Sequence, residues 1–346
     1  MKIRALLSLF LVTAVFLSAC GNSKGESSKE ETKDALDIYT TVYPLQYFTE
    51  AIGGEYVNVE TVYPPGTDEH SFEPSQKDIV KMAESDLFFY IGYNLEGFVT
   101  KAEPILSKEG VSTVAVGETV HLDEDEHANE DEHANEDEHA NEDEHANEDE
   151  HANEDEHANE DEHANEEDGH DHGGVNPHLW LDPIYSIDMA KTIKDELTKK
   201  MPEQEEYFNR QFNELSEKLE ALDEKFATTI ESGRTNKVIV SHSAYGYWEE
   251  RYGLEQIGVT GLTSSNEPSQ KELGKIVTMA EEEDLNYVIF EQNISSKLTE
   301  IIQKEMGAKS LELHNLSVLT DKDIEAGEDY FSLMEKNIKT LQTALQ

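Results

Sequence analysis

Hydrophobic positions along the chain group into short apolar runs and into longer stripes with a helical period. The stretches 36–44 and 57–64 are rich in Val, Ile, Thr and Tyr and end at prolines, which predicts two strands. Between them, 45–54 predicts a helix closed by glycines. Next along the chain, 75–85 predicts a helix and 86–92 a buried strand. Strands that alternate with helices predict an α/β fold with a parallel sheet flanked by helices.

The same pattern returns in the second half of the chain. The pentapeptide EPSQK occurs twice, beginning at Glu73 and at Glu267, and each copy leads into a helical pattern and then an apolar strand. In each copy the serine is followed three residues later by an acid, which is a capping-box pattern typical of a helix start. The repeat therefore predicts two related, pseudo-symmetric α/β lobes.

A long helix is predicted between the lobes. Its apolar stripe steps by three or four residues over roughly eight turns, through Phe208, Phe212, Leu215, Leu219, Leu222, Phe226 and Ile230. Such a stripe can form a coiled-coil dimer, but the small number of heptads favours a stiff helix packed along both lobes. We thus expect an N-terminal lobe at 36–185, linker helices at 186–232 and a C-terminal lobe at 233–346 in a monomer.

The N-terminus predicts export and lipidation. Residues 1–19 combine a short basic start with an apolar run of signal-peptide length. The sequence LSAC resembles a bacterial lipobox, and Cys20 is the one cysteine of the chain, so it cannot form an internal disulfide. A plain signal peptide is the alternative. We expect 20–35 to be a lipidated tether that holds the protein on the outer face of the cytoplasmic membrane.

Charge narrows the range of partners. The formal net charge is −49, and the segment 123–172 alone holds 26 Asp and Glu with no Lys or Arg, which leaves −23 for the rest of the chain. A protein that binds nucleic acid needs a basic face, so we expect no nucleic-acid partner. This negative net charge is compatible with an exported protein that binds cations.

The segment 121–174 is dominated by a six-residue repeat of one histidine among three acids. Adjacent acids repel one another, which predicts a disordered loop within the N-terminal lobe. One interpretation is an inert acidic spacer. The other is a set of weak metal sites, each formed by two or three histidines with carboxylates. The histidines concerned are His121, His127, His133, His139, His145, His151, His157, His163, His170 and His172.

Four other side chains are candidates for one tight metal site. His242 and Glu291 each end an apolar strand, and ligands of open α/β sheets bind beyond the carboxyl ends of strands. We therefore expect both side chains to face one crevice. His70 lies in a loop bounded by proline and glycine, and His178 lies between two prolines. Such rigid loops can hold an imidazole in place, which a tight metal site needs.

Five motifs carry a resemblance to a known family. They are TTVYPLQYF, GTDEHSFEPS, NPHLWLDP, SHSAYGYW and FEQNISSK, and they occur in this order. With the lipobox, they resemble the metal-binding lipoproteins of bacterial ABC importers for zinc and manganese (cluster A-I), in particular the ZnuA-type zinc-uptake branch. The resemblance implies two lobes joined by a long helix, with metal at their interface. It also implies an ABC permease with its cytoplasmic ATPase as partners, and His70, His178, His242 and Glu291 as ligands.

The residue types favour zinc. Zinc accepts imidazole and carboxylate in four-coordinate sites, whereas manganese prefers oxygen ligands, and manganese-type relatives usually carry an acid at the position of His242. Glu291 is expected to be the fourth ligand, the alternative being an acceptor that orients an imidazole. Asp182 and Glu69 are further candidates for that orienting role. His314 lies where the family carries no ligand, so we expect it to be structural.

The resulting expectation is a zinc-binding subunit that captures Zn²⁺ and delivers it to a permease. One alternative is a homologue that binds manganese, and another is a surface adhesin that a metal merely stabilises. A zinc hydrolase would need a water in the fourth position and a carboxylate as base. The chain contains no HExxH motif and no evident Ser or Cys nucleophile motif, so we expect no enzyme activity.

Overall fold

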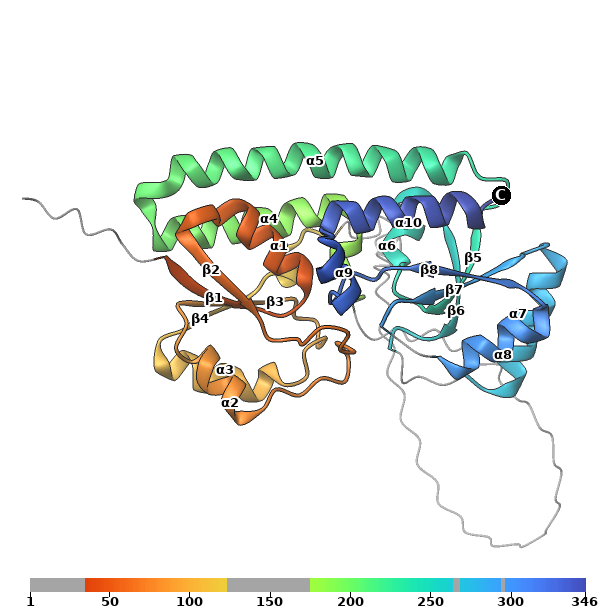
Figure 1. Cartoon of the computed structure of the whole chain (residues 1–346), viewed down its shortest axis with the longest axis horizontal. Helices are drawn as coiled ribbons and strands as arrows, with labels where there is room; N and C mark the ends of the chain where they lie inside the picture. The colour runs from red at the N-terminus through yellow and green to blue at the C-terminus, as the bar shows by residue number, and fades with distance from the viewer. Residues whose placement is uncertain (1–34, 123–174, 264–267, 294–295) are drawn as a thin grey trace, which may run out of the picture. The chain divides into compact units, whose positions relative to one another are not determined.

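The computed structural model describes residues 35–122, 175–263, 268–293 and 296–346 (Figure 1). The chain divides into two units, 1–34 and 35–346, and every described residue belongs to the second. The predicted signal peptide, Cys20, nearly all of the predicted tether and the histidine repeat lie outside the described residues. Within the described ranges, none of the helices combines the length and apolarity that crossing a membrane requires.

The first lobe is built on a four-stranded parallel sheet in the order β2-β1-β3-β4. Helix α2 begins with the predicted capping box, since the Ser75 hydroxyl accepts from the Asp78 N–H and the Asp78 carboxylate accepts from the Ser75 N–H. The elements are β1 (Leu36–Thr40), α1 (Tyr43–Gly53), η1 (Gly54–Tyr56), β2 (Val57–Thr61), α2 (Gln76–Met82), β3 (Leu87–Tyr90), α3 (Val99–Glu109), β4 (Ser112–Ala115) and η2 (Gly117–Thr119).

The second lobe repeats this topology. Its parallel sheet has the order β6-β5-β7-β8, and α7 follows its second strand as α2 follows the second strand of the first lobe. Ser269 and Glu272 form the second capping box. The elements are β5 (Lys237–His242), α6 (Gly246–Tyr252), β6 (Glu255–Thr260), α7 (Gln270–Glu282), β7 (Tyr287–Glu291), α8 (Lys297–Met306), β8 (Lys309–Leu313), α9 (Asp321–Ala326) and α10 (Tyr330–Ala344). The prediction of two pseudo-symmetric α/β lobes is confirmed.

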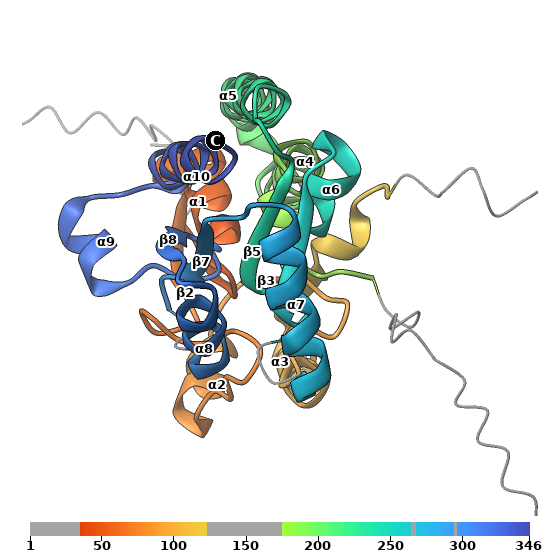
Figure 2. The same cartoon turned by 90° about the vertical axis from the view of Figure 1, so that its right-hand side faces the viewer.

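Two helices connect the lobes. Helix α4 (Pro183–Lys200) is preceded by η3 (Leu179–Leu181), and η4 (Pro202–Gln204) leads into α5 (Glu205–Glu231). At 1.5 Å per residue α5 is about 40 Å long. Figure 1 shows α5 running along the top of both lobes, with α4 beneath it over the first lobe and α10 beneath it over the second; α5 also contacts α1 of the first lobe (Figures 1 and 2). The apolar stripe of α5 is therefore covered within the chain, as the stiff-helix interpretation predicts.

The hydrophobic core crosses the boundary between the lobes. One cluster of buried side chains includes Phe48 of α1, Phe89 of β3, Phe226 of α5, Val240 of β5 and Leu341 of α10. A smaller second cluster lies in the second lobe, between its sheet and helices α7 and α8. Because helices and both sheets share one core, the carboxyl ends of the strands are held facing each other across a fixed interface.

Candidate metal centre

Three imidazoles converge at the interface of the lobes. His70 comes from the loop after β2, His178 from the segment before η3, and His242 from the end of β5. The Nε2 atom of His178 lies 3.3 Å from Nε2 of His70 and 3.3 Å from Nε2 of His242. Zinc–nitrogen bonds of 2.0–2.1 Å in a tetrahedron place two nitrogens about 3.3 Å apart. The spacing of these nitrogens therefore matches that of ligands around one zinc ion.

The segment that carries His178 is tied to the second lobe. The Trp180 indole N–H donates to the carbonyl oxygen of Asn315 at 2.6 Å, and the Trp248 indole N–H donates to the carbonyl oxygen of Leu181 at 2.8 Å. The ring of Trp180 lies 5.3 Å from that of His178, centroid to centroid. Both indoles are fully buried. These two bonds join the segment 178–181 to the second lobe.

The loop that carries His70 is also attached to the second lobe. The Gly66 N–H donates to the carbonyl oxygen of Leu319 at 3.0 Å, and the Asn293 amide donates to the carbonyl oxygen of Thr67 at 3.0 Å. More of this loop is exposed than of the His178 segment, and the His70 side chain keeps 8% of its surface exposed, whereas His178 and His242 are buried.

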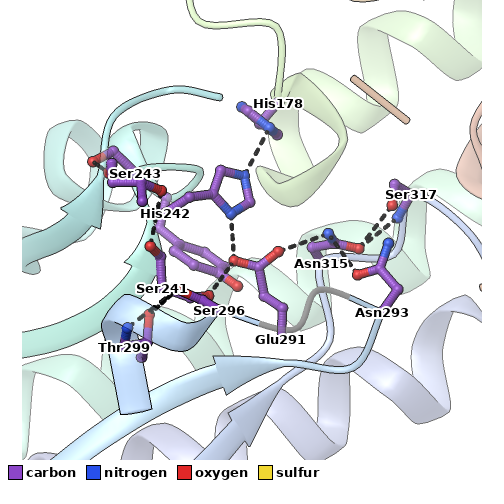
Figure 3. Close-up of polar contacts among 12 residues, drawn as sticks. His178, Ser241, His242, Ser243, Glu291, Asn293, Ser296, Thr299, Asn315 and Ser317 are labelled. Atoms are coloured by element: carbon purple, nitrogen blue, oxygen red, sulfur yellow. Dashed lines mark hydrogen bonds and ion pairs between the residues drawn. The ribbon is translucent and has the colours of Figure 1, made fainter. Parts of the chain in front are cut away.

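Hydrogen bonds at Nδ1 set the tautomer of two imidazoles. Nδ1 of His178 lies 2.7 Å from the side-chain oxygen of Asn176, which also accepts from the His178 backbone N–H. Nδ1 of His242 contacts the Glu291 carboxylate (Figure 3). An amide oxygen and a carboxylate can only accept, so in both rings Nδ1 carries the proton and the Nε2 lone pair is free for a metal.

Glu291 lies on the far side of His242 from the other two histidines. One carboxylate oxygen contacts Nδ1 of His242 and accepts from the Ser241 hydroxyl at 2.8 Å. The other accepts from the Asn315 amide at 2.8 Å. This arrangement is that of an acceptor that orients His242. The role of Glu291 as the fourth ligand stays a prediction.

The other two acids predicted near the site occupy different places. Glu69 is buried, and its carboxylate lies 4.0 Å from Nε2 of His70. Asp182 instead caps α4, since it accepts from the Ile184 and Tyr185 N–H groups, and it pairs with Arg251 of α6. Asp182 thereby fixes the start of α4 after the His178 segment, without a recorded bond to an imidazole.

Burial sets the protonation of the centre. It lowers the pKa of His70 to about 4, with the neighbouring charge of His242 as a second cause. Burial also lowers the pKa of His178, and it raises the pKa of Glu69 to about 7. For His242 burial acts in the same downward sense and is the largest single cause, but the carboxylates of Glu291, Glu69 and Asp68 together outweigh it, so the pKa is raised. His70 and His178 are therefore unprotonated at neutral pH, as metal ligands must be.

The remaining histidines divide into two groups. His314 is buried, its Nε2 lies 3.2 Å from the Asp323 carboxylate, and its Nδ1 accepts from the Leu316 N–H. These bonds are those of the structural histidine that the sequence predicts. His121 is exposed and is not grouped with the three converging imidazoles. The other nine histidines of the repeat region, from His127 to His172, lie outside the described residues.

Sequence reasoning missed the amides of the site. Asn176 holds His178, while Asn293 and Asn315 reach Glu69 from the second lobe. The position of Asn176, two residues before the histidine in NPH, is a local signal for such a bond. No local pattern marks Asn315, because its partners are distant in the sequence.

The comparisons with known proteins identify the family of the chain. Residues 38–344 match the family described as zinc-uptake complex component A, periplasmic. The chain is 32% identical over 345 residues to the zinc-binding lipoprotein AdcA of Streptococcus pneumoniae (strain TIGR4), covering 97% of this chain and 60% of AdcA. It is 30% identical over 348 residues to the high-affinity zinc uptake system protein ZnuA of Bacillus subtilis, covering 97% of each chain. The chain thus spans about 60% of the length of the AdcA relatives and nearly all of ZnuA.

A solved structure supports the same assignment. The Zn(II)-bound ZnuA-like domain of Streptococcus pneumoniae AdcA is 29% identical, with a TM-score of 0.66, covering 90% of this chain and 99% of that domain. The family description is periplasmic, which indicates an extracytoplasmic location. The family resemblance seen in the sequence is confirmed: the chain belongs to the ZnuA family of zinc-uptake components.

Proposed function

We propose that this protein captures Zn²⁺ outside the cell membrane and delivers it to an ABC permease driven by a cytoplasmic ATPase. The convergence of the Nε2 atoms of His70, His178 and His242 carries the proposal, because their 3.3 Å spacings suit one tetrahedral ion. The names of the relatives, which describe zinc binding and zinc uptake, support the same cargo.

Zinc is favoured over manganese by the donor set. Three imidazole nitrogens are softer ligands than the oxygens that manganese prefers, and zinc lies above manganese in general affinity for such sites. The nitrogens come from both lobes, so the ion would bridge them. A manganese-binding homologue would be expected to have more oxygen ligands in its metal site.

We propose binding without catalysis. A zinc hydrolase needs a carboxylate that is free to act as a base toward a metal-bound water. The two oxygens of Glu291 already accept from His242, Ser241 and Asn315 on the side away from the converging nitrogens. For the adhesin alternative, growth of a deletion strain in zinc-depleted medium is decisive, since only loss of transport creates a zinc requirement.

Release to the permease requires a difference between the empty and filled forms. Helix α5 and the shared core oppose a wide hinge motion between the lobes. The loop that carries His70 is more exposed than the segments that carry His178 and His242, so we propose that it moves when zinc enters or leaves.

The tight site is tested by replacing its histidines one at a time in a chain that lacks 123–172, so that the repeat cannot mask the result. A structural zinc site is worth about 10–16 kcal/mol, so one of four ligands contributes about 3 kcal/mol, or roughly a 10²-fold change in Kd. His70→Ala, His178→Ala and His242→Ala should each weaken zinc binding by at least that factor. His314→Ala is the matched control and should leave it unchanged. Tight binding by the triple variant would refute the site.

The role of Glu291 is tested separately with two substitutions. Glu291→Gln keeps an oxygen that can accept from Nδ1 of His242, whereas an amide is a poor zinc ligand. If Glu291 orients His242, Glu291→Gln should bind zinc more tightly than Glu291→Ala. If Glu291 is the fourth ligand, both substitutions should weaken binding equally, and X-ray absorption should show the loss of one oxygen ligand.

The segments outside the described residues carry two further proposals. We propose that Cys20 is lipidated after removal of 1–19, which mass spectrometry of the membrane-extracted protein tests against a Cys20→Ala variant. We also propose that the repeat concentrates zinc at several weak sites, with an inert spacer as the alternative. Calorimetry should show that deletion of 123–172 removes the weak sites and retains the tight one. An equal number of weak sites before and after deletion would contradict the proposal.

A further inference from the structure

Asn315 lies in the loop that follows β8 and is fully buried. Its side-chain oxygen accepts from Gln292 at 2.8 Å, from the Ser317 hydroxyl at 2.8 Å and from the Ser317 N–H at 3.1 Å. The Ser317 N–H is a backbone group that can only donate, so the atom that faces it must be the oxygen of the amide. The orientation of the amide is therefore fixed, and its NH₂ group points the other way.

The NH₂ group of Asn315 donates to carboxylates from both lobes. It lies 2.8 Å from an oxygen of Glu291 and 3.3 Å from an oxygen of Glu69, and a third contact, to the side-chain oxygen of Asn293, measures 3.3 Å. Figure 3 shows Asn315 next to Glu291 and Asn293. Each carboxylate is in turn next to a converging histidine: Glu291 contacts His242, and Glu69 lies 4.0 Å from His70.

We infer that Asn315 is a positioning residue of the zinc site, which holds Glu69 and Glu291 together and so makes the placement of His70 depend on that of His242. The inference rests on the function proposed above. Through Asn315, the two lobes would affect each other's metal ligand: Glu69 lies next to His70 in the first lobe, and Glu291 contacts His242 in the second.

The chemistry of the amide suits this position. Two buried carboxylates need hydrogen-bond donors, because a buried acceptor left unpaired costs about 1–3 kcal/mol and more when it is charged. An Arg or Lys could supply those donors, but its positive charge would repel an incoming Zn²⁺ at close range. A neutral amide supplies donors and leaves the negative potential of the carboxylates in place.

The experiment compares Asn315→Ala with Asn337→Ala in the chain that lacks 123–172. Asn337 is a matched control: it is also buried, and its side chain bonds the backbone N–H and carbonyl of His314, the residue before Asn315, with no recorded bond to a carboxylate. Loss of a residue that supports a metal ligand typically weakens metal binding about 10–100-fold. We expect Asn315→Ala to raise the zinc Kd by about tenfold or more, and Asn337→Ala by less than about twofold.

A double-mutant cycle with Glu69→Ala separates positioning from general loosening of the fold. If Asn315 acts through Glu69, the double variant should bind zinc more tightly than the product of the two single effects predicts. Asn315→Asp serves if the alanine variant does not fold, since it keeps an oxygen toward Ser317 and Gln292 but replaces the donors by an acceptor. Because its added negative charge by itself favours Zn²⁺, weaker zinc binding than in the parent chain would report the loss of the donors, and binding as tight as in the parent would count against the positioning role.

The outcomes distinguish the inference from the proposed function. Failure of the parent chain without 123–172 to bind zinc tightly would refute the function itself. The positioning role alone would be overturned if the parent chain binds zinc tightly and Asn315→Ala has the same zinc Kd as Asn337→Ala. It would also be overturned if the effects of Asn315→Ala and Glu69→Ala on zinc binding are additive. The zinc Kd of each single and double variant is measured by competition with a chromogenic chelator, on protein shown to be folded by circular dichroism.

Discussion

Trp180→Phe tests whether the interface is rigid before zinc binds. The indole N–H of Trp180 is the recorded donor to the carbonyl oxygen of Asn315, at 2.6 Å, and joins the His178 segment to the second lobe. Phenylalanine keeps an aromatic ring next to His178 but removes this donor. The substitution therefore separates the hydrogen bond between the lobes from the packing of the imidazole.

The expected loss of stability has two parts. A buried carbonyl without a donor costs about 1–3 kcal/mol. The smaller ring leaves a void of about 40 Å³, which costs about 1 kcal/mol at roughly 24 cal/mol per Å³. We therefore expect Trp180→Phe to lower the free energy of unfolding by about 2–4 kcal/mol.

Trp248→Phe is the matched control for this substitution. Trp248 is equally buried, and its indole N–H likewise crosses the interface, to the carbonyl oxygen of Leu181. Its stability cost should be similar, but the structure records no ring contact with His178 and no bond to Asn315. We expect zinc binding to weaken about tenfold in Trp180→Phe and to stay within about twofold of wild type in Trp248→Phe.

Urea unfolding with a chelator present, followed by far-ultraviolet circular dichroism, measures stability without the contribution of bound zinc. Chelator competition then gives the zinc Kd of each folded variant. A loss of less than about 0.5 kcal/mol in Trp180→Phe, below the usual net value of one hydrogen bond, would refute the reasoning. Equal zinc binding by the two variants would show that the link to Asn315 does not affect the site.

Two further predictions concern pH and metal choice. The hydrogen bond from His314, with those from Thr320, lowers the pKa of Asp323, so the carboxylate stabilises the fold above its unfolded pKa near 3.9 and this contribution is lost as pH falls. Asp323→Asn should therefore lower the free energy of unfolding at pH 7, with a difference that shrinks below about pH 4; a difference independent of pH would contradict it. His242→Glu introduces a harder ligand and should lower the zinc-to-manganese affinity ratio, and a titration that finds the ratio unchanged or higher would count against His242 as a ligand.

The sequence predicted the fold well because the fold depends on local signals. Apolar runs with β-branched residues, helix caps at Ser75 and Ser269, and the stripe of α5 each act within a few residues of the chain. The duplicated EPSQK segment then linked the two halves, and both sheets have the same strand order. The sequence singled out the histidines that the structure brings together for a related reason, since His242 ends an apolar strand and His178 lies between prolines.

What the sequence could not show is how distant segments meet. The bond from Trp180 to Asn315 joins residues 135 positions apart, and the bond from Asn315 to Glu69 joins residues 246 positions apart. Neither has a periodicity or a spacing that a pattern could detect. The orientation of Glu291 is equally hidden, because a residue at the end of a strand can turn toward the metal or behind its neighbour.

The two lobes share a topology but not a half-site, and strand register shows why. Thr40 pairs with Phe89 in the first sheet, as Val240 pairs with Ile289 in the second. Two residues further along the chain from each of these pairs, Val42 is the counterpart of His242 and Ile91 is the counterpart of Glu291 in the duplicated framework. Val42 and Ile91 are fully buried and apolar, so the first lobe cannot place a ligand at these positions. Its histidine must come from a loop instead, which is where His70 lies.

A hydroxyl at equivalent positions, Thr41 and Ser241, donates to a buried acid in both lobes, although the two acids come from different positions of the chain. The Thr41 hydroxyl donates to the buried Glu96 carboxylate at 2.7 Å, as the Ser241 hydroxyl donates to Glu291 at 2.8 Å. In the first lobe the remaining donors to Glu96 are the backbone N–H groups that follow β3, so the carboxylate serves the fold alone. In the second lobe a histidine takes the place of those donors. A hydroxyl at the end of the first strand thus holds a buried acid in each lobe: in the first lobe that acid binds the loop after β3, and in the second it contacts the imidazole of His242.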